Sequence, residues 1–140
     1  MNRDCLDVFE ADGHGYRPLI DFGSWRVAVL RFDEALRSDR IRRIERHTES
    51  DEVFVLLAGG AVLIVGGTGR QPESLEVHAM QAGRIYNLRR NAWHTSLLGA
   101  DATVLHVENR DTGPANTQFA DLDPDRRLVI QEAARRHLAG

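Results

Sequence analysis

The stretch that decides the fold runs from position 45 to position 59 and reads Glu45-Arg-His-Thr-Glu-Ser-Asp-Glu-Val-Phe-Val-Leu-Leu-Ala-Gly59. It joins two apolar segments through a polar bend and carries Glu45, His47 and Glu52 beside that bend. Side chains alternate faces along a strand, so Glu45 and His47 point the same way if the first segment is extended. Glu52 then begins the partner strand. His94 opens a later apolar segment, and all four side chains are of types that coordinate divalent metals.

Short apolar segments recur along the chain with turn residues between them, and the middle of the chain shows no long helical period. This spacing indicates an all-β sandwich or barrel. In a small closed barrel, inward side chains from several strands share one interior, so the four residues can meet. The predicted strands are Trp25–Phe32, Ile41–His47, Glu52–Leu57, Ala61–Val65, Leu75–Met80, Arg84–Leu88, His94–Leu98 and Ala102–Glu108, with a weaker one near Arg17–Ile20.

A C-terminal α-helix is predicted after Asp123 and Pro124, because this pair supplies an N-cap followed by proline at the first helical position. The segment Asp111–Asp123 is predicted to be a loop that leads to the helix, and Asp33–Ser38 a short helical turn. The apolar residues expected on one side of the C-terminal helix are Leu128, Ile130, Ala134 and Leu138.

The length and charge of the chain exclude several classes of protein. A chain of 140 residues is expected to form one domain, residues 1–140. The net charge of −3 argues against nucleic-acid binding, which usually requires a basic domain. One cysteine, Cys5, cannot form an internal disulfide, and no apolar run is long enough to span a membrane. We therefore expect a cytoplasmic protein with neither a nucleic-acid nor a membrane partner.

All 18 basic residues are arginine, and the chain has no lysine. This excludes a lysine Schiff base, including covalently held pyridoxal phosphate, and it excludes a Walker P-loop. The glycines between positions 66 and 69 are therefore interpreted as a hairpin turn rather than as a phosphate cradle.

Taken jointly, the spacings resemble those of the cupin superfamily. The first cupin motif has His-x-His, three or four residues, Glu, six residues and Gly; this chain fits with Glu45 in place of the first histidine, followed by His47, Glu52 and Gly59. The second motif has Gly, five residues, Pro-x-Gly, two residues, His, three residues and Asn. The chain keeps this spacing from Gly83 to His94. It differs from the motif in residue type at Arg89, Asn91 and Leu98, where the motif has proline, glycine and asparagine.

The resemblance covers roughly residues 25–108 and implies a double-stranded β-helix (jelly-roll barrel), often dimeric, with a divalent metal inside. Residues 111–139 would form the C-terminal linker and helix. By position, the metal ligands would be Glu45, His47, Glu52 and His94. Two carboxylates and two neutral imidazoles favour Mn, Fe or Ni, and zinc is possible.

Other residues around the expected site are candidates for catalysis or substrate binding. His106 and Glu108 share one strand face; they form a proton-transferring pair if that face is inward and are surface groups if it is outward. Either Tyr86 or Asn87 should look into the barrel. Arg43 could hold a substrate carboxylate, balance the glutamates or reach solvent, and Trp93 either closes the core or binds a ligand.

Three functions are compatible with this reading. The first is a small metal-dependent cupin enzyme of oxygenase, isomerase or lyase type that acts on a polar or anionic metabolite, with a homodimer as the expected assembly. The second is a non-catalytic cupin that binds or senses a small ligand. The third is a metal-free, epimerase-like cupin in which His and Tyr act as acid and base.

Overall fold

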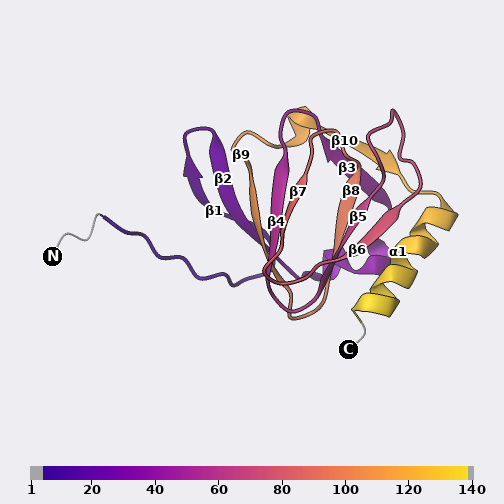
Figure 1. Ribbon diagram of the computed structural model, residues 1–140, viewed down its shortest axis with the longest axis horizontal. Coiled ribbons are helices and arrows are strands. Elements are labelled where there is room, and N and C mark those ends of the chain that lie inside the picture. The colour runs from indigo at the N-terminus through magenta and orange to yellow at the C-terminus, as the bar shows by residue number, and fades with distance from the viewer. Residues whose placement is uncertain (1–4, 139–140) are drawn as a thin grey trace.

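Ten strands form two antiparallel five-stranded sheets in the computed structural model, which describes residues 5–138. The strand order is β1-β2-β9-β4-β7 in one sheet and β10-β3-β8-β5-β6 in the other. Each sheet combines strands that are far apart in the chain. The two sheets face each other as a jelly roll, and the C-terminal helix packs outside the second sheet (Figure 1). The prediction of an all-β jelly roll with a C-terminal helix is confirmed.

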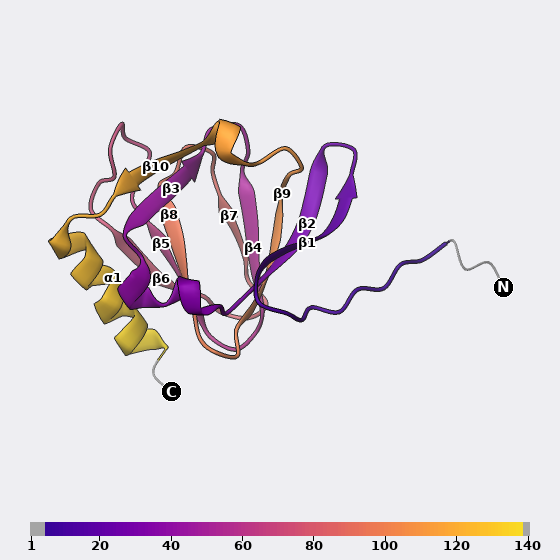
Figure 2. The same cartoon turned by 180° about the vertical axis from the view of Figure 1, so that it is seen from behind.

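The strands are β1 (Gly15–Phe22), β2 (Trp25–Arg31), β3 (Arg43–His47), β4 (Glu52–Ala58), β5 (Ala61–Val65), β6 (Glu76–Ala79), β7 (Ile85–Leu88), β8 (His94–Leu98), β9 (Thr103–Asn109) and β10 (Thr117–Asp121). Three short 3₁₀ helices, η1 (Glu34–Leu36), η2 (Ser38–Arg40) and η3 (Pro114–Asn116), precede α1 (Pro124–His137) among the described residues. Residues 5–14 run as an extended segment away from the sheets (Figure 2).

Two edge strands differ from the sequence prediction. β1 is longer than the weak strand expected near Arg17–Ile20, and its pairing with β2 shifts register beside Pro18, because proline cannot donate a ladder hydrogen bond. β10 lies inside the segment predicted as a loop. It carries mostly exposed residues and pairs with β3 alone, so its stability comes from that partner rather than from an apolar pattern of its own.

The space between the sheets holds one hydrophobic cluster, in which Phe54, Leu56 and Val104 are buried with seven other residues. Strand alternation places Glu52 of β4 on the same face as Phe54, and His106 of β9 directly opposite Phe54. Polar side chains therefore enter the interior at one end of an otherwise apolar core. This is the arrangement that positions the candidate site.

A second cluster lies outside the β10-β3-β8-β5-β6 sheet, under α1. The Asp123 side chain caps this helix by accepting a hydrogen bond of 2.8 Å from the Arg126 backbone N–H. Ile130 and Ala133 are the buried residues of the helix. Leu128 is 62% exposed, which corrects its predicted place on the packed side: it lies only two residues from Ile130, about 200° around the helix.

Neither α1 nor the shorter helices of residues 5–138 are long and apolar enough to cross a membrane.

Candidate metal centre

The four residues expected as metal ligands come from three strands and face one another. Glu45 and His47 lie on β3, Glu52 begins β4 and His94 begins β8. Glu45 pairs directly with His94 across the β3–β8 ladder. Glu52 Oε1 lies 3.6 Å from His47 Nε2 and 3.3 Å from His94 Nε2, and Glu45 Oε1 lies 4.0 Å from His94 Nε2. The structure therefore brings all four predicted residues together.

The outward nitrogens of both imidazoles are held in place by hydrogen bonds. His94 Nδ1 lies 3.0 Å from the Ala92 carbonyl oxygen, and His47 Nδ1 lies 2.9 Å from Thr117 Oγ1. A carbonyl oxygen only accepts, so Nδ1 of His94 carries the proton of that bond. In the neutral ring, Nε2 then presents a lone pair to the interior, which is the usual orientation of a metal-bound histidine.

This orientation requires a cation. In the neutral ring protonated at Nδ1, the Nε2 lone pair of His94 faces the Oε1 atoms of Glu52 and Glu45, at 3.3 and 4.0 Å. Electron pairs that converge in a buried site repel one another unless a proton or a metal ion lies between them. The side chains of His94 and Glu52 are only 4% and 6% exposed, so water screens this repulsion poorly. The buried His/Glu cluster is therefore compatible with a divalent metal site.

Glu52 also contacts a third imidazole. Its Oε2 accepts a hydrogen bond of 3.2 Å from His106 Nδ1. Burial alone would raise the pKa of Glu52, but the three neighbouring imidazoles, His106 first and then His47 and His94, outweigh burial and hold that pKa well below the ordinary value. For His47, burial lowers the pKa of the imidazole, but the contact with Glu52 outweighs burial, so the pKa is raised above the ordinary value. Glu52 is thus the fixed anion of the site.

Glu108 lies on the same inner face of β9 and completes a second group of ligand-type atoms. Nitrogen and carboxylate oxygen atoms of His47, Glu52 and Glu108 all lie within 4.8 Å of one another, as do those of Glu45, His47 and His94. Burial, and then the neighbouring Glu52 carboxylate, raise the pKa of Glu108 to about 7. One Glu108 oxygen accepts a hydrogen bond from the Tyr16 hydroxyl, and the other is buried without a partner among the described residues.

A cavity of about 240 Å³ opens the cluster to solvent between the edge strands β1 and β10. Tyr16, Glu45, His47 and Glu108 line it on the cluster side, and Phe119 of β10 lies at its rim. The cavity can admit a small molecule to the His47 imidazole and to the Glu45 and Glu108 carboxyl groups.

No protein-family model matches the sequence, and no curated protein matches it. Solved structures do match the fold. A cupin-2 domain protein from Shewanella frigidimarina NCIMB 400 matches with 15% identity and a TM-score of 0.50 over 71% of this chain and 84% of that chain. KdgF from Halomonas sp. matches with 13% identity and a TM-score of 0.51 over 69% and 78%. Pac13, described as a nucleoside dehydratase, matches with 8% identity and a TM-score of 0.53 over 77% of both chains.

The fold is that of a small cupin-type domain. At these identities the likeness concerns the fold alone, and the chemistry of the site depends on the residues of this chain.

Several residues expected near the candidate metal centre use their polar atoms elsewhere. The Tyr86 hydroxyl accepts a hydrogen bond of 2.9 Å from the Gln81 backbone N–H, and Asn87 donates one of 3.2 Å to Asp51. Trp93 is buried in the cluster under α1 and donates to the Gly69 carbonyl. The Arg43 guanidinium lies 3.8 Å from the centre of the Phe119 ring, close to the rim of the cavity.

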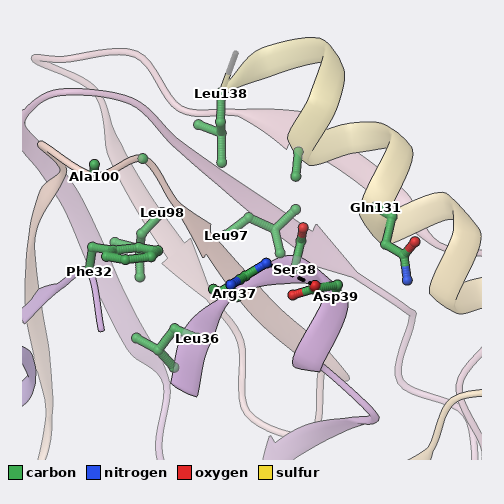
Figure 3. Close-up of a pocket in the computed structure, with 12 residues that line it drawn as sticks. Phe32, Leu36, Arg37, Ser38, Asp39, Leu97, Leu98, Ala100, Gln131 and Leu138 are labelled. Atoms are coloured by element: carbon green, nitrogen blue, oxygen red, sulfur yellow. Dashed lines mark hydrogen bonds and ion pairs between the residues drawn. The ribbon is translucent and has the colours of Figure 1, made fainter. Parts of the chain in front are cut away.

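A larger hollow of about 390 Å³ lies between α1, η2 and the far end of β8 (Figure 3). Leu97 and Leu98, which line it, are three and four residues along β8 from His94. Its charged residues Arg37 and Asp39 pair with each other at 3.1 Å. This hollow has no histidine among the described residues that line it, and its Asp39 carboxylate is already paired. The smaller cavity beside the cluster is therefore the better candidate for a catalytic site.

Two residues beside the candidate metal centre do not stand out in the sequence. Tyr16 belongs to the edge strand that seemed weakest, and Thr117 to the segment predicted as a loop. The Tyr16 pKa is raised by burial and by its bond to Glu108, so the phenol remains protonated at neutral pH. Its only sequence signal was an aromatic residue in a short alternating segment.

Proposed function

We propose that this chain is a metal-dependent cupin enzyme that acts on a polar or anionic small molecule. His47, Glu52, His94 and Glu45 would hold the metal. The observation that carries the proposal is the buried Nε2 atom of His94, whose lone pair faces two carboxylates and needs a cation between them.

The residues suit a hard or borderline dication. Two imidazoles with two carboxylates favour Mn, Fe or Ni, with zinc as a further possibility. When bound, such an ion supplies Lewis acidity to a substrate oxygen. The protein's own contribution is to orient the imidazoles through Ala92 and Thr117 and to supply the negative charge of the buried Glu52 carboxylate.

The cavity wall favours isomerase or lyase chemistry over oxygenation. Glu108 presents a carboxyl whose pKa of about 7 suits proton exchange at neutral pH, and Tyr16 donates to the same carboxyl. The second Glu108 oxygen is buried without a hydrogen-bond partner among residues 5–138, and the Glu52 carboxylate lies beside this carboxyl, so a proton exchanged here would be held next to the metal cluster. A similar fold in Pac13, described as a nucleoside dehydratase, is compatible with a lyase.

Elemental analysis of protein purified without added metal tests the proposal. We expect near-stoichiometric metal in the native chain and a loss of most of it in His94→Ala. His78→Ala is the matched control, because His78 is half-exposed and pairs with Glu76 on the edge strand β6. Equal metal content in native protein and His94→Ala would show that the cluster is not the metal site.

The runner-up is a metal-free, epimerase-like enzyme. His106 favours it, because its Nε2 is buried without a partner among residues 5–138 and its ring lies edge-on to Tyr16 at 5.9 Å. In that case a proton rather than a metal would separate His94 from the carboxylates. Native protein would then carry no metal, and chelators would leave ligand binding unchanged.

A further inference from the structure

A second hollow of about 730 Å³ lies on the outer side of β3 and gathers positive charge. Four guanidinium groups line it, together with Thr68, Asn91 and a single carboxylate, Asp51. The four are Arg46, Arg70, Arg89 and Arg90. The chain as a whole carries a net charge of −3, so this concentration of arginines, here called the basic pocket, is not the general character of the surface.

Most of this charge is not neutralised by the protein. Asp51 is already engaged, because its carboxylate accepts the Arg90 backbone N–H at 2.8 Å and the Asn87 amide at 3.2 Å. No carboxylate among the described residues lies within 4.0 Å of the guanidinium groups of Arg70, Arg89 or Arg90. Guanidinium groups stay charged at any physiological pH, so within residues 5–138 three cations of the basic pocket have no ion pair within 4.0 Å, with the Asp51 carboxylate as the one nearby negative charge in the pocket wall.

The frame of the basic pocket is held by backbone hydrogen bonds. The Asn91 N–H donates to the His47 carbonyl at 2.7 Å, and the Trp93 N–H donates to the Gly67 carbonyl at 2.9 Å. Arg46 stacks on the Trp93 ring at 4.5 Å and donates to the Gly69 carbonyl. These bonds tie strand β3 to the loop between β5 and β6 and to the loop between β7 and β8. Because this frame is formed before any ligand binds, the entropy cost of binding is lower.

The basic pocket uses two of the positions at which the sequence departs from the cupin motif. Arg89 and Asn91 stand where the motif has proline and glycine. Asn91 has a φ of 69°, the left-handed conformation that glycine adopts most easily and that asparagine also tolerates. The loop therefore keeps the backbone of the motif while it adds a cation and an amide to the pocket wall.

An apolar hollow of about 350 Å³ adjoins the basic pocket and shares Thr68 and Arg89 with it. Its other walls include Leu63, Val65 and Leu88. A ligand with an anionic head at the arginines can therefore place an apolar body against aliphatic side chains.

We propose that the basic pocket and the adjoining hollow bind a small phosphate monoester with an apolar or aromatic body. Phosphate oxygens match the paired donors of arginine better than a spherical anion does. The site is separate from the metal cluster, because Arg46 alternates with Glu45 and His47 along β3 and so projects from the opposite face of the sheet.

Calorimetric titration at low ionic strength tests this, with phenyl phosphate as the probe and glycerol phosphate as the polar comparison. We expect saturable binding of phenyl phosphate, about tenfold or more tighter than glycerol phosphate because only the phenyl ring buries apolar surface. Arg89→Gln combined with Arg90→Gln should weaken phenyl phosphate about tenfold or more. Absence of binding by the native chain overturns the proposal, and equal affinity for the two esters overturns the assignment of the apolar hollow.

Two controls separate the pocket from other sources of binding. Arg84→Gln combined with Arg136→Gln removes the same charge from exposed positions outside the pocket, and should change affinity less than about twofold. If it weakens binding as much as the pocket variant does, the effect is one of net charge and the site is refuted. His94→Ala should keep phenyl phosphate affinity; its loss would place the ester on the metal cluster instead.

Discussion

Glu52 shows at the scale of single residues why a buried charge can persist in this fold. Its two oxygens are divided among three imidazoles, with Oε1 near His47 and His94 and Oε2 bonded to His106. An unpaired carboxylate in this place would cost several kcal/mol of desolvation. Because every partner is a histidine, the site can exchange protons for a metal without leaving the carboxylate unpaired.

The identity of the last carboxylate ligand is a question that one pair of variants can answer. Glu45→Gln should weaken metal affinity about tenfold or more, because a Glu45 oxygen lies within 4.8 Å of both the His47 and the His94 ligand nitrogens. Glu108→Gln should change it less than about threefold, because the Glu108 oxygen groups with the nitrogen of only one of the two histidines, that of His47. Competition titrations with a metal-sensitive dye measure both. The reverse order of effects would replace Glu45 by Glu108 in the ligand set.

Glu45→His then tests the character of the site. It would restore the usual three-histidine, one-glutamate set of cupins and raise the charge of the site by one. Zinc and copper should gain affinity relative to manganese, because imidazole suits them better than carboxylate does. An unchanged ratio of zinc to manganese affinity would mean that Glu45 does not coordinate and that His47, Glu52 and His94 act alone.

Residue types and spacing were enough to predict which side chains form the cluster, but not how all of them are oriented. Strand alternation does not decide which way His106 and Glu108 face, because apolar residues occur on both faces of β9, with Val104 on one and Leu105 and Val107 on the other. Only the pairing of β9 between β2 and β4, with His106 opposite Phe54, places both side chains inside.

At the scale of elements, edge strands were the hardest to predict. β10 offers Thr-Gln-Phe-Ala-Asp, which has no strong apolar alternation, yet it contributes Thr117 to the orientation of His47. Its ladder with β3, in which Thr117 opposes His47, exists only in the folded chain. Central strands such as β4 and β5 carried their own pattern and were predicted within about two residues, the usual uncertainty of a boundary.

The loop between β7 and β8 depends on Asp51 in a pH-dependent way. The Arg90 backbone N–H and the Asn87 amide lower the pKa of Asp51 below its ordinary value. A lowered folded-state pKa means that its stabilisation is complete above the unfolded pKa of about 3.9 and is lost as the pH falls through the folded value. The stability difference between native protein and Asp51→Asn should therefore stay constant near neutral pH and shrink as the pH falls below about 4. Urea denaturation at several pH values measures it, and a constant difference would contradict this role.

The contact of α1 with the sheet should be energetically concentrated at Ile130, which is fully buried. Ile130→Ala should lower the free energy of unfolding by about 2–5 kcal/mol, because it removes buried methyl groups and leaves a cavity. Leu128→Ala is the matched control; at 62% exposure it should cost less than about 1 kcal/mol. Equal losses in the two variants would mean that α1 is not held by the face described above.

At the scale of the whole molecule, the candidate metal centre joins the two sheets. β3 and β8 belong to one sheet, β4 and β9 to the other, and their polar side chains meet at one end of a shared apolar interior. A bound cation would therefore link strands that are otherwise connected mainly by hydrophobic packing. This coupling follows from the sheet topology and could be foreseen only after the resemblance to cupins supplied that topology.

Removal of the metal should therefore lower the thermal stability of the whole domain. A ligand present at about 100 times its dissociation constant stabilises the native state by about 2.7 kcal/mol, which for a domain of this size corresponds to a fall in Tm of roughly 5–10 °C on chelation. Differential scanning calorimetry with and without EDTA measures this, and added metal should restore the Tm. His94→Ala should show no dependence on EDTA, because it lacks the imidazole that faces both carboxylates. A native Tm that EDTA leaves unchanged, in protein shown by elemental analysis to carry metal, would mean that the ion is bound away from the interface between the sheets.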